Sequence, residues 1–127
     1  MRFLTLFALA LLGAGCAAGP QATPTEVATP VDPAALGRQT FVSYCVPCHG
    51  TSGEGFVNAL DAPALNADGQ SHLLSDEAIL SAIIDGGAAS GGSMAPLGDA
   101  LSAGQEAAVL QFVHTLWSDE QRDAHVH

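Results

Sequence analysis

The sequence contains no lysine and only three arginines, against thirteen aspartate and glutamate residues, so its 127 residues carry a net charge of −10. Such an acidic chain is a poor partner for nucleic acid or for anionic lipid surfaces. Two interpretations of the acidity stay open. It can serve solubility, including adaptation to salt, or it can guide docking onto a basic partner.

Long apolar runs and alternating patterns are also missing. The longest apolar stretch, residues 3–12, follows Arg2 and is too short to span a membrane comfortably. It therefore predicts an export signal over residues 1–15. The protein is therefore expected outside the cytoplasm. No segment alternates between apolar and polar residues for long enough to predict a strand, so we expect an all-α protein.

Cysteine is scarce, with three residues in the chain. Cys45 and Cys48 belong to the segment CVPCH, and C-x-x-C-H is the pentapeptide through which a chain binds haem covalently and ligates its iron. Two thiols at i and i+3 lie about one helical turn apart on one face, as bonding to two vinyl groups on one haem edge requires. His49 follows directly, and imidazole is a good ligand for iron.

Two other uses of a C-x-x-C pair agree less well with this sequence. A zinc site needs four ligands, and there is no second cysteine pair. A redox dithiol of this spacing is typical of a βαβ unit, and no βαβ pattern surrounds residues 45–48. We therefore predict one covalently bound haem c as the cofactor.

Methionine occurs only twice, as Met1 and Met94. Met1 would be lost with the export signal, which leaves Met94 as the only thioether. It lies in a loop of glycines and a proline, residues 91–96, which can present the sulfur to the open side of the iron. Imidazole and thioether together raise the reduction potential of a haem. We predict His49 and Met94 as the axial ligands, with His72 as the rival for the sixth position.

The third cysteine, Cys16, follows the apolar stretch. The segment from Leu12 to Cys16 resembles the lipobox of bacterial lipoproteins, although Gly13 stands where a leucine is usual. Ordinary cleavage within residues 15–18 is the alternative. Lipidation is favoured because Cys16 would otherwise be an exposed thiol without a partner. Residues 16–32, rich in proline, alanine and threonine, then form a tether to the membrane.

Residues 33–123 are expected to form one small domain, with a flexible tail at 124–127. A domain of about 90 residues has a marginal core and often depends on a cofactor. We therefore expect the haem to supply the centre of the core, and the haem-free chain to be largely disordered.

Three helices are expected in this domain. The first begins at the Asp32-Pro33 cap and continues to the haem motif. The second follows a Ser75 cap and ends at Gly86, and residues 50–69 before it form a loop. The third begins at a capping box of Ser102 and Gln105. Its apolar face contains Val109, Phe112, Val113, Leu116 and Trp117.

These features together resemble class I monohaem cytochromes c. In that family an N-terminal helix with a glycine and, four residues on, an aromatic crosses a C-terminal helix with aliphatic and aromatic residues. Gly37 and Phe41 match the first helix, and residues 109–117 match the second. The resemblance implies a cytochrome c fold of three to four short helices around one covalently bound haem.

The family also places a proline and a leucine after the haem motif, and residues 62–65, APAL, resemble that element. Carried over, the Pro63 carbonyl would accept a hydrogen bond from the second nitrogen of His49, and Leu65 would pack on the haem. Arg38 is a candidate partner for a haem propionate. His114 is expected to be solvated or otherwise satisfied.

With both axial positions filled, the iron would have no open site for substrate, so one-electron transfer is expected and catalysis is not. The leading hypothesis is a carrier tethered to a membrane, periplasmic or on another extracytoplasmic face, that shuttles electrons between exported redox proteins. Two alternatives stay open. One is a dedicated haem subunit of a larger dehydrogenase or oxidase complex, and the other is a peroxidase or gas sensor from which Met94 dissociates.

Overall fold

The computed structural model describes residues 31–56 and 61–125. These residues form helices and loops without a strand, which confirms the all-α prediction. None of their helices is long and apolar enough to cross a membrane. The predicted export signal, Cys16, most of the predicted tether and His127 lie outside the described residues.

The haem motif ends a helical run that begins at Pro33. The run consists of α1 (Pro33–Thr40), a π-helical turn η1 (Phe41–Cys45) and α2 (Val46–His49). The Asp32 carboxylate accepts a hydrogen bond from the Ala34 amide at 3.1 Å, so the predicted cap is present.

The π turn was not predicted, and it makes one turn of this run wider than an α-helix. Its last hydrogen bond runs from the Val46 amide to the Phe41 carbonyl, five residues back. Pro47 gives the physical reason, because a proline within a helix cannot donate to the carbonyl four residues earlier and its ring clashes with that carbonyl. A wider turn before Pro47 relieves the clash at Ser43.

The second expected helix is α3 (Asp76–Asp85), which lies between two short 3-10 turns, η2 (Ser71–Leu73) before it and η3 (Ala88–Ser90) after it. The Ser75 hydroxyl accepts from the Ala78 amide at 3.3 Å, as the predicted cap requires. Gly86 ends the helix at a φ of 83°, a conformation that favours glycine.

The third expected helix is α4 (Ala103–His114), and both hydrogen bonds of its predicted capping box, between Ser102 and Gln105, are present. It ends earlier than the apolar pattern indicated, so Trp117 follows in a turn. The Thr115 hydroxyl donates to the Phe112 carbonyl at 2.6 Å, and such local bonds compete with a continuing helix. Trp117 is nevertheless buried, with 3% of its surface exposed.

A further helix, α5 (Asp119–Ala124), was not predicted. Ser118 and Gln121 form a second capping box at its start, and this sequence signal could have revealed it. The structure places Ala124 in this helix and His125 at its C-cap, where the sequence had suggested the beginning of a flexible tail.

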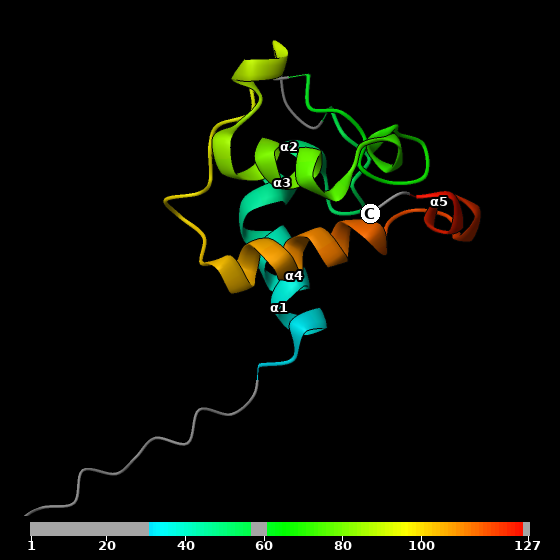
Figure 1. The fold of residues 1–127 in the computed structure, drawn as a ribbon, viewed down its shortest axis with the longest axis horizontal. Helices are drawn as coiled ribbons and strands as arrows, with labels where there is room; N and C mark the ends of the chain where they lie inside the picture. The colour runs from blue at the N-terminus through cyan, green and yellow to red at the C-terminus, as the bar shows by residue number, and fades with distance from the viewer. Residues whose placement is uncertain (1–30, 57–60, 126–127) are drawn as a thin grey trace, which may run out of the picture.

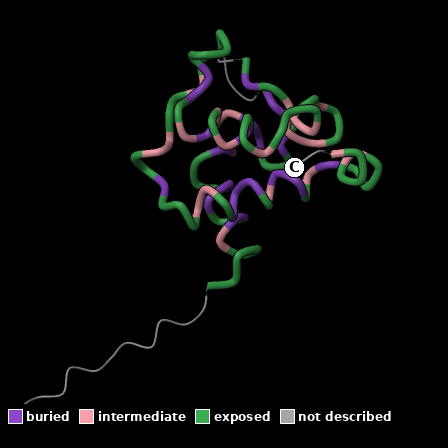
Figure 2. The backbone as a smooth tube through the Cα atoms, viewed as in Figure 1, coloured by how far each residue is buried: buried purple, intermediate pink, exposed green. Residues whose placement is uncertain are grey.

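The core lies where α1 crosses α4, and α3 also packs against α4 (Figure 1). Figure 2 shows that the buried residues concentrate on the facing sides of these helices. Gly37 is at the crossing, and a Cβ atom on it would lie 2.2 Å from the Ala108 carbonyl oxygen. The core cluster contains Phe41, Cys45, Ile79, Ile83, Leu101, Val109, Leu110, Val113 and Trp117.

Candidate haem site

The two cysteines of the CVPCH segment differ in burial, and Cys45 belongs to the core cluster. Cys45 ends η1 with 7% of its surface exposed, and Cys48 is half-buried in α2. Burial, and secondly the neighbouring Cys48, raise the pKa of Cys45 to about 11. Without a bond to a cofactor, Cys45 would therefore be a neutral thiol at neutral pH, and a neutral group suits the apolar surroundings that a macrocycle would share.

His49 is held in a defined orientation. It is the last residue of α2, is 6% exposed, and its Nδ1 lies 2.9 Å from the Pro63 carbonyl oxygen. Because a carbonyl only accepts, Nδ1 carries the proton and donates it, which leaves Nε2 with the lone pair. A ligand nitrogen oriented by a backbone carbonyl on its other side is typical of metal-binding histidines.

Gly55 allows the Pro63 carbonyl to reach His49. It adopts a φ of 76°, and a Cβ atom on it would lie 2.6 to 2.7 Å from backbone atoms of residues 62–64. Backbone hydrogen bonds fix the same approach, because the Gly55 amide donates to the His49 carbonyl at 2.7 Å and the Leu65 amide donates to the Gly53 carbonyl at 2.7 Å. The sequence predicts a loop over this stretch but does not connect Gly55 with Pro63.

Glu54 fixes the opposite side of this loop. Its carboxylate accepts hydrogen bonds from the Ser52 amide and hydroxyl, both at 2.9 Å. Bonds from backbone amides and from the Ser52 hydroxyl lower the pKa of Glu54, so it stays ionised in mildly acidic solution. The carboxylate therefore closes the turn that follows the haem motif.

Met94 lies in the loop between η3 and α4 and is half-buried against the core cluster that includes Cys45. The loop is attached to the end of α3, because the Gly87 amide donates to the Met94 carbonyl at 2.9 Å and the Leu97 amide donates to the Ile83 carbonyl at 2.9 Å. A Cβ atom on Gly86 would lie 2.7 Å from the Met94 carbonyl oxygen, so a glycine is needed for this approach.

Leu65 also packs against the core cluster. Its backbone is fixed by Trp117, whose indole nitrogen donates to the Leu65 carbonyl at 3.1 Å and approaches the Ser71 hydroxyl at 2.9 Å. The Trp117 side chain, which follows α4, thus holds the loop that carries Pro63 and Leu65, although the two segments are distant in sequence.

His72 and Arg38 each pack against an aromatic ring. The His72 ring packs 6.3 Å from the Trp117 ring, in an edge-on arrangement. The Arg38 guanidinium lies over the Phe112 ring, 5.3 Å from its centroid, in a cation–π arrangement. The structure therefore gives each a packing role, while Met94 packs against the cluster that contains Cys45.

The residues present agree with a covalent haem. Two cysteines one turn apart, a buried imidazole with a free lone pair and a half-buried thioether form the donor set that such a cofactor needs. Cys45 and Cys48 would hold it covalently, His49 and Met94 would ligate iron, and Pro63 and Leu65 would support it.

The helical fold and this donor set define a c-type cytochrome domain. Residues 32–113 match the family described as cytochrome c oxidase, cbb3-type, subunit III, and the chain belongs to this family. Its cofactor is accordingly one covalently bound haem c, and its chemistry is haem-based electron transfer. No curated protein and no solved structure matches the chain.

Proposed function

We propose that the protein is a one-electron carrier of the class I type, in which His49 and Met94 close both axial positions of the iron. The observation that carries this proposal is the hydrogen bond of 2.9 Å between His49 Nδ1 and the Pro63 carbonyl. It fixes the tautomer whose Nε2 can ligate iron, and it makes that nitrogen more basic.

The chain's own residues then have separate tasks. The haem supplies a reversible Fe(II)/Fe(III) couple. The Pro63 carbonyl holds the His49 proton on Nδ1 through the cycle. The loop bonded to the end of α3 keeps the Met94 sulfur at the core, where it would ligate the iron and so exclude oxygen and peroxide.

Substitution of Met94 tests this assignment. Met94→Leu keeps the volume of the side chain while removing its sulfur. We expect loss of the sulfur-to-iron charge-transfer band at the red edge of the ferric spectrum, a lower reduction potential, and binding of added imidazole or azide. The control is His72→Gln, which should leave all three unchanged. Strong ligand binding or peroxide turnover by the unsubstituted ferric protein would instead support the peroxidase or sensor alternative.

We also propose that the protein is exported and attached to a membrane through a lipid on Cys16. The support is the sequence of residues 1–16 together with the haem motif, because c-type cytochrome domains are usually extracytoplasmic. Mass spectrometry of the mature protein tests this, since one mass reports the haem, the cleavage site and the lipid. Cys16→Ser should abolish the lipid while the haem mass remains. A mature wild-type chain without a lipid would reject the anchor alone.

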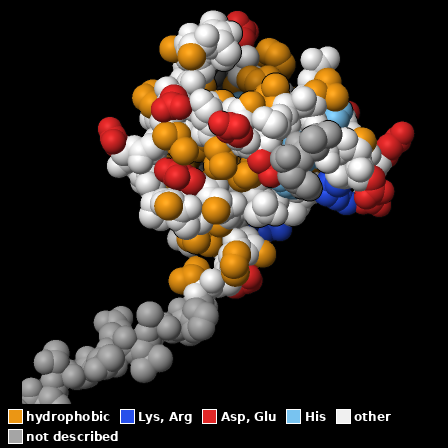
Figure 3. Space-filling view, in the orientation of Figure 1, with side chains coloured by type: hydrophobic (Ala, Val, Ile, Leu, Met, Phe, Trp, Pro, Cys, Tyr) orange, Lys and Arg blue, Asp and Glu red, His pale blue; other side chains and the backbone are white. Residues whose placement is uncertain are grey.

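Exported redox proteins are the proposed electron donor and acceptor. Figure 3 shows acidic side chains scattered over the visible face of the domain around hydrophobic ones, so a partner would meet a broadly negative surface. Association with a basic partner would then slow as salt rises. An association rate independent of ionic strength would leave solubility as the role of the acidity.

A second candidate is a fixed haem subunit of an oxidase complex, which the description of the matched family favours. The proposed tether favours the mobile carrier, because a fixed subunit has less need of one. Native purification from the source membrane distinguishes them. A stoichiometric partner that survives high salt supports the subunit, and recovery of the protein alone supports the carrier.

A further inference from the structure

Two histidines and one carboxylate meet at a point formed by three separate helices. Asp76 begins α3, His114 ends α4 and His125 follows α5. The Nε2 atoms of His114 and His125 lie 2.9 and 2.8 Å from the same oxygen, Oδ1 of Asp76. One ligand atom from each residue lies within 4.8 Å of the others.

The cluster is shielded from solvent. The His125 side chain is 1% exposed, that of His114 is 10% exposed and that of Asp76 is 24% exposed. The Trp117 ring packs on both imidazoles, with centroid distances of 4.4 Å to His114 and 4.7 Å to His125. A charge placed here is therefore screened less by water than a charge on the surface.

The hydrogen bonds of His125 show that this point needs positive charge. Its Nδ1 lies 3.0 Å from the His72 carbonyl, which can only accept, so Nδ1 carries a proton. In a neutral ring, Nε2 would then direct its lone pair at the Asp76 oxygen. A contact of 2.8 Å between two lone pairs is repulsive, so either a second proton or a metal cation must lie between them.

We propose that Asp76, His114 and His125 form a second metal site, which binds a divalent cation of the zinc type. Two imidazole nitrogens and one carboxylate oxygen are ligands that zinc prefers, and three protein ligands leave one position for water. The bond from His125 Nδ1 to the His72 carbonyl supplies the outer contact that orients a ligating imidazole. Ligand atoms around tetrahedral zinc lie about 3.3 Å apart, so a small outward movement would admit the ion.

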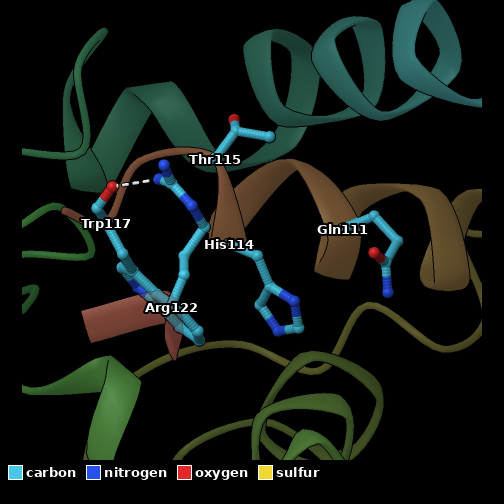
Figure 4. Close-up of a pocket in the computed structure, with 5 residues that line it drawn as sticks. All are labelled: Gln111, His114, Thr115, Trp117 and Arg122. Atoms are coloured by element: carbon cyan, nitrogen blue, oxygen red, sulfur yellow. Dashed lines mark hydrogen bonds between the residues drawn. The ribbon is translucent and has the colours of Figure 1, made fainter. Parts of the chain in front are cut away.

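A cavity lies beside one of the three proposed ligands. A cavity of about 530 Å³ opens beside His114 and is lined also by Gln111, Thr115, Trp117 and Arg122. Figure 4 shows the His114 ring projecting from the end of α4 into this region, while Arg122 is turned to the Trp117 carbonyl. Arg122 also pairs with Asp119, so its charge is partly neutralised. The net charge of −10 favours accumulation of cations.

Zinc titration of the haem-loaded protein by calorimetry tests the proposal. We expect one ion per chain, with release of protons because the His125 Nε2 proton must leave. Repeating the titration in buffers of different ionisation enthalpy measures that release. Zinc at about 100 times its Kd should also raise the midpoint of thermal unfolding by on the order of 10 °C, because only the folded chain brings the three ligands together.

Variants identify the ligands. Asp76→Asn and His125→Gln should each weaken zinc binding at least tenfold. Glu77→Gln is the matched control, since it removes the same charge from the next residue of α3 and should leave the affinity within about twofold. The visible spectrum of each variant reports whether the haem domain is intact, independently of zinc. Absence of saturable binding by the wild type, or equal affinities of Asp76→Asn and Glu77→Gln, would overturn the proposal.

Discussion

Gly37→Ala sets local helix preference against packing, and the structure decides which effect is larger. Alanine inside a helix is favoured over glycine by about 1 kcal/mol. At Gly37, however, the added Cβ atom would lie 2.2 Å from the Ala108 carbonyl oxygen and 3.1 Å from the Phe112 Cβ. Both atoms belong to α4, so neither can rotate away.

The magnitude follows from the separation that these contacts require. A normal contact would need α1 and α4 to move apart by about 1 Å, and such a gap removes a quarter to a half of each dispersion contact across it. Phe41 and Val109, both fully buried, lie in this region of the core. Overpacking typically costs about 1–3 kcal/mol. An approach of 2.2 Å to a backbone atom puts Gly37→Ala at the upper end of that range, about 3 kcal/mol, so the net loss after the helix preference is about 2 kcal/mol.

Guanidinium unfolding of the haem-loaded protein, followed by circular dichroism, measures this loss. Thermal unfolding should show a midpoint lowered by roughly 5–20 °C. The control is Gly104→Ala in the first turn of α4, where the nearest atom to an added Cβ is the Ser102 hydroxyl at 4.0 Å. Gly104→Ala should be neutral or slightly stabilising. If both substitutions stabilised the protein, the close approach of α1 and α4 would be rejected.

Three further predictions concern the loop and the C-terminal end. Trp117→Phe should lower the free energy of unfolding by about 1–2 kcal/mol, because the indole bond to the Leu65 carbonyl is lost. Gly55→Ala should lower the stability by about 2 kcal/mol or more and shift the reduction potential, because it displaces the Pro63 carbonyl from His49. In chelator, stability should fall as pH rises through the folded pKa of His125, which the bond to the Asp76 carboxylate raises above 6.5.

Each of these has a defined measurement. Chemical unfolding with and without Trp117→Phe gives the first difference, and an unchanged midpoint would contradict it. Protein-film voltammetry measures the reduction potential of Gly55→Ala. A potential equal to that of the wild type would contradict the role of the Pro63 carbonyl in orienting His49. The stabilisation from protonated His125 should be fully present below the ordinary histidine pKa. It should decrease as the pH rises through the raised pKa of the folded state. A free energy of unfolding that does not change between about pH 6 and pH 8 would refute this prediction.

Much of the fold could be predicted because its signals are local. The Ser75 and Ser102 caps, the glycine end of α3 and the apolar period of α4 each depend on residues within a turn or two of one another. The wider turn at residues 41–45 could not be predicted in this way, since it depends on how Pro47 is accommodated inside a continuing helix.

The candidate site divides similarly. The CVPCH segment predicts its own chemistry, and the expected contact of Pro63 with His49 is present at 2.9 Å. The requirement for Gly55 and Gly86 depends on which backbones meet in three dimensions, which spacing alone does not reveal. The sequence likewise predicts no binding role for His114 and His125, because it does not show that the ends of α4 and α5 meet the start of α3 at Asp76.

The π turn at Phe41–Cys45 also sets an angular relationship within the molecule. Each residue of an α-helix advances the chain by about 100° around its axis, so a turn with an extra residue rotates everything after it relative to everything before it. Gly37, which contacts α4, lies before this turn, and the CVPCH segment ends after it. Deleting one residue here would preserve helicity yet direct Cys45 away from the core cluster. The turn therefore sets the rotation of the CVPCH segment about the helix axis relative to the face of α1 that contacts α4.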